Sequence, residues 1–323
     1  MNKTKRKRIF LSWSYSRRSE DIAALEGIEY VCFPLNLRIR ILQFPILFVR
    51  TIMLLLRRTP GVIFVQHPPV HILFPVLLYS LLSGARFIID SHIIPGTTLI
   101  EKPYHRVYLF LHRCYSYHAA VTLFHSRRML DRLKEWRCNC MVLENPVRQL
   151  NIDAVFRVEK RPAVGMVTSF SKDEHIQDVI DCAREMKEVF FYITGDRRKA
   201  PRRMAESASA NVRFTGYIQG EEYYAFLGCM DLVIVLTDRE ESALLGAYEA
   251  VSAETPLVVS DTETMRDYFP KGVVFVGNDS KGIEKGIRKA LGEQEKLEAQ
   301  IKELKKEKHT KQRKNFQKID RLT

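Results

Sequence analysis

The sequence predicts an α/β protein built from two Rossmann-like domains. Short β-rich runs alternate with helical stretches along the 323 residues, which is the pattern of parallel sheets covered by helices. A proline-bounded segment interrupts this alternation, which then begins again. Because 323 residues exceed the usual size of a single core and 46% of them are hydrophobic, two domains are the expected organisation.

The first half repeats a strand, helix, strand order. Its strands are predicted at Ile9–Trp13, Tyr30–Phe33, Val62–Val65, Phe87–Asp90, Ala119–Phe124 and Met141–Leu143. The helices between them are predicted at Ser19–Glu26, Ile41–Arg58, Ile72–Ser83, Arg106–Tyr117 and Arg127–Trp136. We therefore expect residues 1–150 to form the first Rossmann-like domain.

Residues 145–163 have the character of a linker. They lack sustained hydrophobic periodicity and carry Pro146 and Pro162 near their two ends. We place the domain boundary within this segment, between residues 150 and 151.

The second half restarts the same alternation. Its strands are predicted at Val164–Thr168, Phe190–Thr194, Val212–Thr215, Leu232–Leu236, Leu257–Ser260 and Val273–Val276. The helices are predicted at Ile176–Lys187, Glu221–Leu227, Leu244–Ser252 and Lys281–Leu291. Residues 151–292 should therefore form a second Rossmann-like domain.

The composition changes after Gly292, where Lys and Glu dominate and apolar residues become few. Pairs such as Glu298 and Lys302 lie four residues apart, a spacing that supports an exposed helix. We interpret residues 293–323 as a solvated helix that frays into a basic tail, in preference to a nucleic-acid-binding arm.

The charge is unevenly distributed. Residues 1–150 carry 22 basic and 9 acidic side chains, a net charge of +13, whereas residues 151–292 have a net charge of −4 and residues 293–323 of +4. A basic half beside an acidic one implies an anionic partner, such as membrane phospholipid, a lipid-linked phosphate or nucleic acid. The chain has no zinc-finger, helix-turn-helix or aromatic RNA-binding motif, so we expect no nucleic-acid partner.

The cysteines and the apolar runs indicate a cytoplasmic protein. Six cysteines lie scattered, and the only close pair, Cys138 and Cys140, has no second pair to complete a zinc site. The basic start Lys3–Arg8 is followed by polar residues and predicts no secretory signal. The apolar runs Ile41–Leu56 and Val70–Ala85 are shorter than the roughly 20 residues that a membrane-spanning helix needs.

Glu241 and Glu249 are the most informative pair of residues. They lie eight positions apart, after the predicted strand Leu232–Leu236 and before the predicted strand Leu257–Ser260. A strand, a glycine-containing turn, a helix and another strand describe the carboxyl edge of a parallel sheet, where α/β proteins bind ligands. The alternative is a pair of acids on a helix surface, since Glu is common and this spacing alone is weakly specific.

The two Rossmann-like halves, the E-x7-E pair and the strand after it resemble the GT-B glycosyltransferases, in particular the retaining family-4 type of glycosyltransferase group 1. The resemblance is closest over residues 163–290. Val65–Pro69 and Ile88–His92 add a weaker likeness to lipid-linked mannosyltransferases. The resemblance implies a GT-B fold, in which residues 1–150 form an acceptor domain that faces, across a cleft, a nucleotide-sugar donor domain of residues 151–292.

The resemblance gives the two acids different roles. Glu249 would accept hydrogen bonds from the ribose diol, as acids do in dinucleotide folds. Glu241 would be the catalytic acid beside the transferred sugar, where a carboxylate offsets the positive charge that develops at the anomeric carbon, with Glu240 as the alternative in register. Leu245 and Gly246, at the turn into the helix, are also expected to contact the donor.

Two further segments match the donor domain of these enzymes. Gly195 ends the strand-and-turn segment Phe191–Asp196, and Gly216 and Tyr217 end the segment Asn211–Tyr217, where the nucleotide base is expected to lie.

The segment Thr168–His175 departs from the pattern of the family. Such enzymes carry there an Arg and a Lys that neutralise the donor diphosphate, and these positions fall on Phe170 and His175. One possible substitute is a helix N-terminus with its Ser and Thr side chains, such as Ser169. The other is a set of nearby basic residues, Lys172, Arg197 and Lys199. For Arg197 to Lys199, a solvated basic cluster is the equal alternative.

In the first half, His92 is a candidate catalytic residue and His67 and Arg17 are candidates for the acceptor side. His92 follows Asp90 at the end of a predicted strand, and histidine suits proton transfer near neutral pH. A structural role is the alternative for each histidine. Arg18 is the alternative to Arg17 for contacting the donor phosphate or the acceptor.

The segment Ile41–Arg58 suggests a membrane contact. It is very apolar and ends in adjacent arginines, so it would lie in the membrane interface with its basic end at anionic head groups. The alternative is a buried helix of the domain, which parallel-sheet proteins commonly contain. Together with the basic first half, the segment predicts peripheral binding on the inner face of the cell membrane.

We expect the chain to transfer a hexosyl group from a UDP- or GDP-sugar to a glycan or lipid-linked acceptor, in cell-envelope or exopolysaccharide synthesis. The resemblance implies a metal-independent enzyme without a cofactor, because groups of the protein stabilise the leaving diphosphate. Family 4 implies retention of configuration, whereas the dolichol-linked relatives leave the stereochemistry open. The alternative is a catalytically silent GT-B protein that scaffolds a polysaccharide-synthesis complex.

Overall fold

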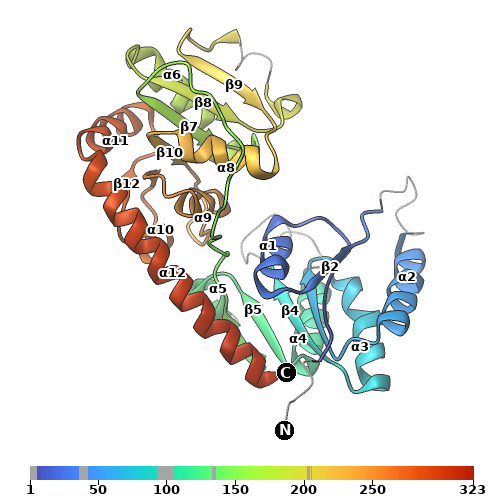
Figure 1. Cartoon of the computed structure of the whole chain (residues 1–323). Coiled ribbons are helices and arrows are strands. Elements are labelled where there is room, and N and C mark those ends of the chain that lie inside the picture. Colours follow the sequence, from blue (N-terminus) through green and yellow to red (C-terminus); the bar gives the residue numbers. More distant parts are fainter. Residues whose placement is uncertain (1–5, 36–42, 93–104, 133–135, 202–203, 205) are drawn as a thin grey trace. The chain divides into compact units, whose positions relative to one another are not determined.

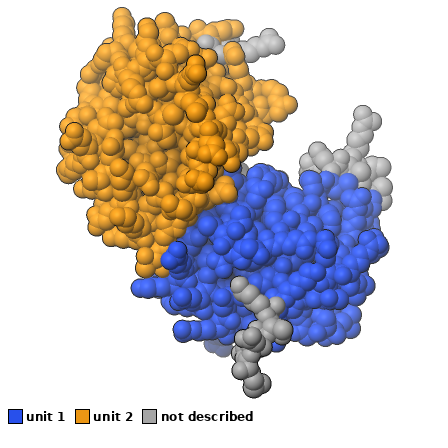
Figure 2. Space-filling view, viewed as in Figure 1, with its two compact units in different colours: residues 1–146, 312–323 blue, residues 147–311 orange. Residues whose placement is uncertain are grey.

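The computed structural model describes residues 6–35, 43–92, 105–132, 136–201, 204 and 206–323 (Figure 1). The chain forms two compact units: unit 1 contains residues 1–146 and 312–323, and unit 2 contains residues 147–311 (Figure 2). The first change of unit falls inside the segment 145–163. The last residues of the chain return to unit 1.

Unit 1 contains a six-stranded parallel sheet in the order β2-β1-β3-β4-β5-β6. The strands are β1 (Arg8–Ser12), β2 (Glu29–Cys32), β3 (Val62–His67), β4 (Arg86–Ser91), β5 (Val121–Phe124) and β6 (Cys140–Val142). The helices are α1 (Arg17–Glu26), α2 (Gln43–Arg58), α3 (Leu73–Ser83), α4 (His105–His118) and α5 (Arg127–Arg132). The parts of two predicted helices at 41–42 and 133–135 lie outside the described residues.

Alternate residues of β1 show how the sheet of unit 1 is covered on both faces. Ile9 and Leu11 belong to the cluster that α2 and α3 cover. Phe10 points to the other face and packs with Ile22 of α1. Hydrophobic residues on both faces explain why these strands appear in the sequence as continuous apolar runs.

Unit 2 contains a second six-stranded parallel sheet, in the order β12-β11-β10-β7-β8-β9. The strands are β7 (Ala163–Val167), β8 (Phe190–Thr194), β9 (Val212–Gly216), β10 (Leu232–Val235), β11 (Leu257–Ser260) and β12 (Val273–Val276). The helices are α6 (Ile176–Glu185), α8 (Gly220–Cys229), α9 (Leu245–Ser252), α10 (Glu263–Tyr268) and α11 (Ser280–Gly292), and short 3-10 turns lie at Lys172–Glu174 and Arg197–Lys199.

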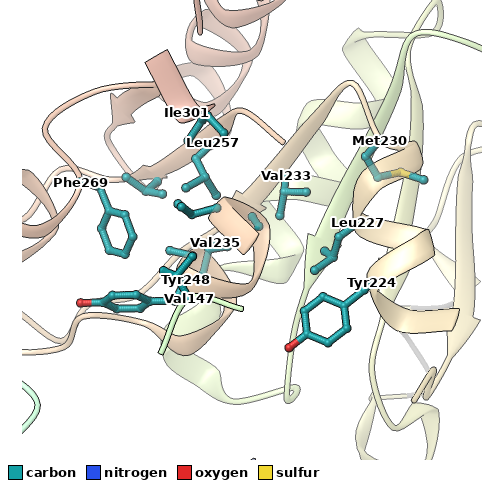
Figure 3. Packing of buried hydrophobic residues seen from close by; sticks show 14 of the residues in the cluster. Val147, Tyr224, Leu227, Met230, Val233, Val235, Tyr248, Leu257, Phe269 and Ile301 are labelled. Atoms are coloured by element: carbon teal, nitrogen blue, oxygen red, sulfur yellow. The ribbon is translucent and has the colours of Figure 1, made fainter. Parts of the chain in front are cut away.

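The core of unit 2 on one side of the sheet is organised around Tyr248 of α9, which is fully buried (Figure 3). Its ring packs edge-on against Phe269, with ring centroids 4.8 Å apart. Val235 and Leu257, from neighbouring strands, belong to the same cluster. Helix α9 is therefore held firmly where it follows β10.

The chain ends in one long helix, α12 (Gln294–Leu322), which differs from the solvated, fraying helix expected from composition. Leu297, Ile301 and Leu304 are buried in unit 2. Phe316 and Ile319 are buried in the core of unit 1. The apolar residues are few, but their spacing of three and four places them on one face, which composition alone does not reveal.

The contact between α12 and Gly272 gives a test of this packing. Gly272 has φ +71°, and a Cβ atom there would lie 2.4 Å from Cγ1 of Ile301. We expect Gly272→Ala to lower the free energy of unfolding by about 1–3 kcal/mol, through backbone strain and overpacking. Gly292→Ala is the matched control, because nothing lies within 4 Å of its added Cβ. Urea denaturation of both variants measures the difference, and equal stabilities would contradict the packing.

Candidate functional site

The carboxyl edge of the sheet in unit 2 gathers the predicted donor-side residues. Strand β7 lies between β10 and β8, so the chain order changes direction between β7 and β10. In parallel α/β sheets, ligands bind at the carboxyl edge beside such a switch point. The residues that follow the strands at this edge are Ser169, Lys172, Gly195, Arg197, Lys199, Gly216, Tyr217, Glu241, Leu245, Gly246 and Glu249.

Two glycines allow the segments at this edge to approach each other closely. A Cβ on Gly195 would lie 2.4 Å from the carbonyl oxygen of Thr168, so the turn after β8 rests directly on the loop after β7. A Cβ on Gly246 would lie 3.3 Å from Cγ1 of Val167, so α9 begins close against β7. Both glycines therefore set the shape of the edge.

The first turn of α9 provides backbone N–H groups at the edge. The helix begins at Leu245, and the N-cap residue, Leu244, offers no side-chain hydrogen bond. The N-terminal N–H groups of a helix have no partner within the helix and favour an anion. The start of α9, with Gly246, is consequently suited to a phosphate group.

Glu249 lies one turn into α9 and is only 3% exposed. The hydroxyl of Tyr223, on α8, donates a hydrogen bond of 2.6 Å to Oε2 of Glu249. This bond fixes the orientation of the carboxylate. The helix-surface alternative for Glu249 is therefore not what the structure shows.

The two candidates for the first acid occupy different environments. Glu241 is half-buried in the turn between β10 and α9. Glu240 is exposed, and its Oε1 accepts a hydrogen bond of 2.7 Å from the backbone N–H of Glu263, the first residue of α10. Glu240 thus stabilises the start of α10, and both acids remain candidates for the donor site.

Side chains connect the loops that follow β7 and β10. Asp173 accepts hydrogen bonds of 3.0 Å from the Thr237 hydroxyl and from the Arg239 guanidinium. Burial raises the pKa of Asp173, but these bonds, a bond from Ser171 and the charge of Arg239 outweigh it and give a lowered pKa. Asp173 is therefore a carboxylate that joins the two loops.

His175 makes the second connection between these loops. Its Nε2 lies 2.6 Å from Oδ1 of Asp238, and its Nδ1 lies 3.1 Å from Oδ2 of Asp178. Burial lowers the pKa of His175, but the two carboxylates outweigh this effect and give a raised pKa. The two carboxylates therefore stabilise the imidazolium form of His175 relative to an ordinary histidine.

The loop after β7 bonds to its own acid. The Glu174 carboxylate accepts hydrogen bonds from the backbone N–H groups of Ser169 and Ser171, both at 3.0 Å, and from the Ser169 hydroxyl at 2.8 Å. The Thr168 hydroxyl donates a further bond to the same carboxylate. In this structure, the donors of Ser169 are therefore occupied by Glu174.

The basic residues proposed as substitutes differ in their surroundings. Lys172, Arg197 and Lys199 are exposed, and no ion pair joins them to another described residue. Arg198, between the last two, is paired with Asp196 at 2.9 Å. Three cationic side chains therefore remain for an anionic ligand at this edge.

Unit 1 contains a row of hydrogen-bonded side chains, Arg18, Asp90 and His92, near the end of β4. Arg18 donates to Oδ1 of Asp90 at 3.0 Å, to Asn145 at 2.9 Å and to the carbonyl oxygen of Leu143 at 2.8 Å. Asp90 is fully buried. Burial raises the pKa of Asp90, but the Arg18 and His92 partners hold it well below its usual range. Arg18 therefore holds the Asp90 carboxylate in place, a role that its burial reveals and its place in the sequence does not.

His92 extends this row of side chains to the surface. Its Nε2 lies 2.8 Å from Oδ2 of Asp90, while its side chain remains partly exposed. Because Asp90 is ionised, Nε2 carries the proton, and a neutral His92 ring then has an unprotonated Nδ1. Arg17 begins α1 and interacts with the Tyr15 hydroxyl.

His67 does not have the exposure that an acceptor contact needs. It is 0% exposed, and its ring stacks on His112 with centroids 3.9 Å apart. Burial lowers the pKa of His67 well below its usual value, and the pKa of His112 and of His125 to about 3. Its burial favours the structural role that the sequence left open as the alternative, and the acceptor-side role of His67 stays a prediction.

The described part of the chain contains no group of three or more His, Cys, Asp or Glu side chains arranged to bind a metal ion. Among the described helices, none has the length and apolar character needed to cross a membrane. Metal independence remains a prediction.

Comparisons with known proteins agree with this fold. Residues 147–307 match the model of a family described as glycosyl transferases group 1, and this segment coincides with unit 2. No curated protein matches the chain in sequence.

Solved structures resemble the chain over nearly its full length at low sequence identity. Sucrose-phosphate synthase from Thermosynechococcus elongatus has a TM-score of 0.73 at 12% identity, covering 98% of this chain and 100% of that one. HepE from Anabaena, in complex with UDP and glucose, has a TM-score of 0.71 at 12% identity, again covering 98% and 100%. A UDP-forming trehalose-phosphate synthase from Burkholderia xenovorans has a TM-score of 0.68 at 11% identity, covering 97% and 98%.

Two six-stranded parallel sheets flanked by helices, shared with these structures, define the class: the protein has the GT-B fold of glycosyltransferases. The family match then gives its place within that class. The segment of residues 147–307 belongs to the glycosyl transferases of group 1. The fold class and the family resemblance predicted from the sequence are both confirmed.

The buried histidines of unit 1 predict a loss of stability in acid. The unfolded chain binds a proton at each histidine below about pH 6.5, whereas the folded protein keeps His112 and His125 neutral down to about pH 3. Stability is therefore complete above pH 6.5 and falls as the pH decreases, by about 1.4 kcal/mol per pH unit for each such histidine.

Urea denaturation between pH 7 and pH 5 measures this dependence. His112→Phe should reduce it, whereas His118→Phe, at the exposed end of the same helix, should leave it unchanged. A midpoint that does not change with pH in the unmodified protein would contradict the neutral, buried state of these rings.

Proposed function

We propose that the chain transfers a hexosyl group from a nucleotide-diphosphate sugar to a hydroxyl of a glycan or lipid-linked acceptor, in cell-envelope or exopolysaccharide synthesis. The observation that carries the donor assignment is the buried Glu249 of α9, whose carboxylate is oriented by Tyr223 of α8. The start of α9 has no side-chain cap and lies at the switch point of the sheet. HepE has been solved in complex with UDP and with UDP-glucose, so a UDP-sugar is the first donor to test.

Each part of the donor has a group that suits it. Glu249 accepts hydrogen bonds from the ribose diol, and Gly216 and Tyr217, at the end of β9, lie where the base is expected. The N–H groups at Leu245 and Gly246 bind the diphosphate, since a helix start attracts negative charge. The exposed side chains of Lys172, Arg197 and Lys199 add positive charge.

Glu241 and His92 are the proposed catalytic residues. Glu241 stabilises the positive charge that develops at the anomeric carbon when the bond to the diphosphate breaks. His92 takes part in proton transfer or contacts the transferred sugar, and Asp90 and Arg18 hold its ring. We propose retention of configuration and no metal or cofactor, because backbone N–H groups and basic side chains stabilise the leaving diphosphate.

A catalytically silent scaffold is the second candidate. It is favoured by the missing Arg and Lys of the diphosphate site, which are Phe170 and His175 here. The bonds of Glu174 to the loop after β7 also place a negative charge beside the expected diphosphate. Nucleotide binding separates the two functions.

A thermal-shift screen with UDP, GDP and their sugars tests the donor site. Ligand at about 100 times its Kd stabilises the native state by about 2.7 kcal/mol, which raises the Tm by about 5–10 °C for a domain of this size. Glu249→Gln should weaken binding more than about tenfold, because hydrogen bonds to a charged group contribute about 1.5–3 kcal/mol. Glu185→Gln, an exposed acid on α6, should bind as the unmodified protein does. Indifference to every nucleotide would support the scaffold.

Tyr223→Phe tests whether the orientation of Glu249 matters. Loss of this hydrogen bond should weaken nucleotide binding about fivefold, since one such bond contributes about 1 kcal/mol. Tyr224→Phe removes the hydroxyl of the adjacent residue on α8 and serves as the control. Equal nucleotide affinities in the two variants, measured by calorimetry, would remove Tyr223 from the donor site.

A further inference from the structure

Helices α2, α3 and α4 form an apolar outer surface on unit 1. Their inner sides belong to the core, where Leu55 of α2 and Val76 of α3 are fully buried against the sheet. Helix α2 contacts α3, and α3 contacts α4. The outer sides of these three helices, which we call the α2–α4 face, carry large apolar residues instead of the polar ones expected on a solvated helix.

The exposure of these residues is high. Leu82 is 81% exposed, Leu81 68%, Phe110 64% and Leu56 62%. Further large apolar residues exposed on the same helices are Phe44, Ile46, Val49, Met53, Phe74, Leu78, Val107 and Tyr117. Contiguous apolar patches of this kind mark interaction surfaces in soluble proteins.

The apolar residues continue from one helix to the next. The ring of Phe48 on α2 packs against Phe74 on α3, with centroids 5.4 Å apart, and Phe44 packs against Phe48 at 6.0 Å. Helices α2 and α3 therefore present one continuous surface rather than two separate stripes.

Helices α2, α3 and α4 carry no acidic side chain. No Asp or Glu occurs between Glu29 and Asp90, and α4 has none either. Along α2, Arg50 and Arg57 alternate with Ile46 and Met53 at spacings of three and four residues, which places all of them on one side of the helix.

The two arginines at the end of α2 have different surroundings. Arg58 is paired with Glu29 at 3.0 Å, so its charge is largely compensated. Arg50 and Arg57 are exposed, and no described residue forms an ion pair with them. Arg50 and Arg57, rather than the adjacent pair Arg57 and Arg58, are therefore the available cations of α2.

We propose that the α2–α4 face binds an anionic lipid bilayer. Apolar side chains interleaved with arginines on one helical face fit the boundary between acyl chains and anionic head groups, where the apolar groups insert and the guanidinium groups remain at the phosphates. A protein partner would have to match an acid-free surface with its own acids around an apolar centre, whereas an anionic bilayer supplies both layers without specific complementarity. This binding needs no donor and is independent of the proposed transfer reaction.

Vesicle flotation of the full chain tests the proposal. The protein should float with phosphatidylcholine vesicles that contain phosphatidylglycerol, and much less with phosphatidylcholine alone. Raising the salt from about 0.1 M to about 1 M shortens the Debye length from about 10 Å to about 3 Å and should release most of the protein. Equal flotation with both vesicles, or none with either, would overturn the proposal.

Paired variants locate the surface. Arg50→Gln with Arg57→Gln should weaken binding to the anionic vesicles by about fivefold for each arginine. Lys285→Gln with Lys289→Gln makes the same change of charge on exposed residues of α11 and should leave binding unchanged. Equal losses in the two pairs would show attraction by net charge alone and would overturn the assignment to this face.

The apolar contribution is tested with Leu81→Ser and Leu82→Ser. This double variant should lose at least about tenfold in binding to the anionic vesicles, because both side chains are largely exposed and would be buried in lipid. Light scattering distinguishes the alternative occupant. A dimer that the same substitutions dissociate, without an effect on vesicle binding, would assign the face to a second copy of the chain.

Discussion

The structure depends on the geometry of parallel strand pairing. Parallel neighbours cannot be joined by a tight turn, so each pair needs a crossover connection, and helices provide most of these in both units. All strands of a sheet then end at the same edge, and the loops that follow them meet there although they are far apart in sequence. The turns after β8 and β10 in unit 2, and the ends of β3 and β4 in unit 1, are brought together by this constraint.

The loops at the edge of unit 2 are tied together mainly by acids. Asp173 pairs with Arg239, and Asp238 pairs with His175. The Glu174 carboxylate accepts hydrogen bonds from the backbone of the loop after β7. In this arrangement, much of the positive charge near the proposed diphosphate site already has an internal partner. Under the proposed function, a donor would rely on backbone N–H groups and on the exposed basic side chains, so its affinity should depend on helix geometry more than on a dedicated pair of cations.

The sequence was sufficient for the strands because they are buried on both faces. Such strands are short apolar runs with turn residues at both ends, and β8, β11 and β12 have the predicted bounds. The buried face of α12 was not predicted, because its five buried apolar residues are spread over a long helix whose composition is dominated by charged residues. Helix α10 was also not predicted, because its 6 residues are too few to show the hydrophobic periodicity of a helix.

The candidate site was predicted in its location but not in its partners. The spacing of Glu241 and Glu249 indicated the edge, while the bond from Tyr223 joins residues 26 positions apart and leaves no local pattern. The same holds for Arg18 and Asp90, 72 positions apart. Burial distinguishes Arg18 from Arg17 and favours a structural role for His67, and the burial of a single histidine depends on the folded core rather than on a local sequence pattern.

The return of the chain to unit 1 has a consequence for how that unit is made. Phe316 and Ile319 pack with Phe10 and Ile22, and Arg8 pairs with Asp320 at 2.6 Å. During synthesis, the core of unit 1 therefore stays incomplete until residues 312–323 have been translated, which is after all of unit 2. A fragment that ends at residue 146 lacks the part of this hydrophobic core that Phe316 and Ile319 provide.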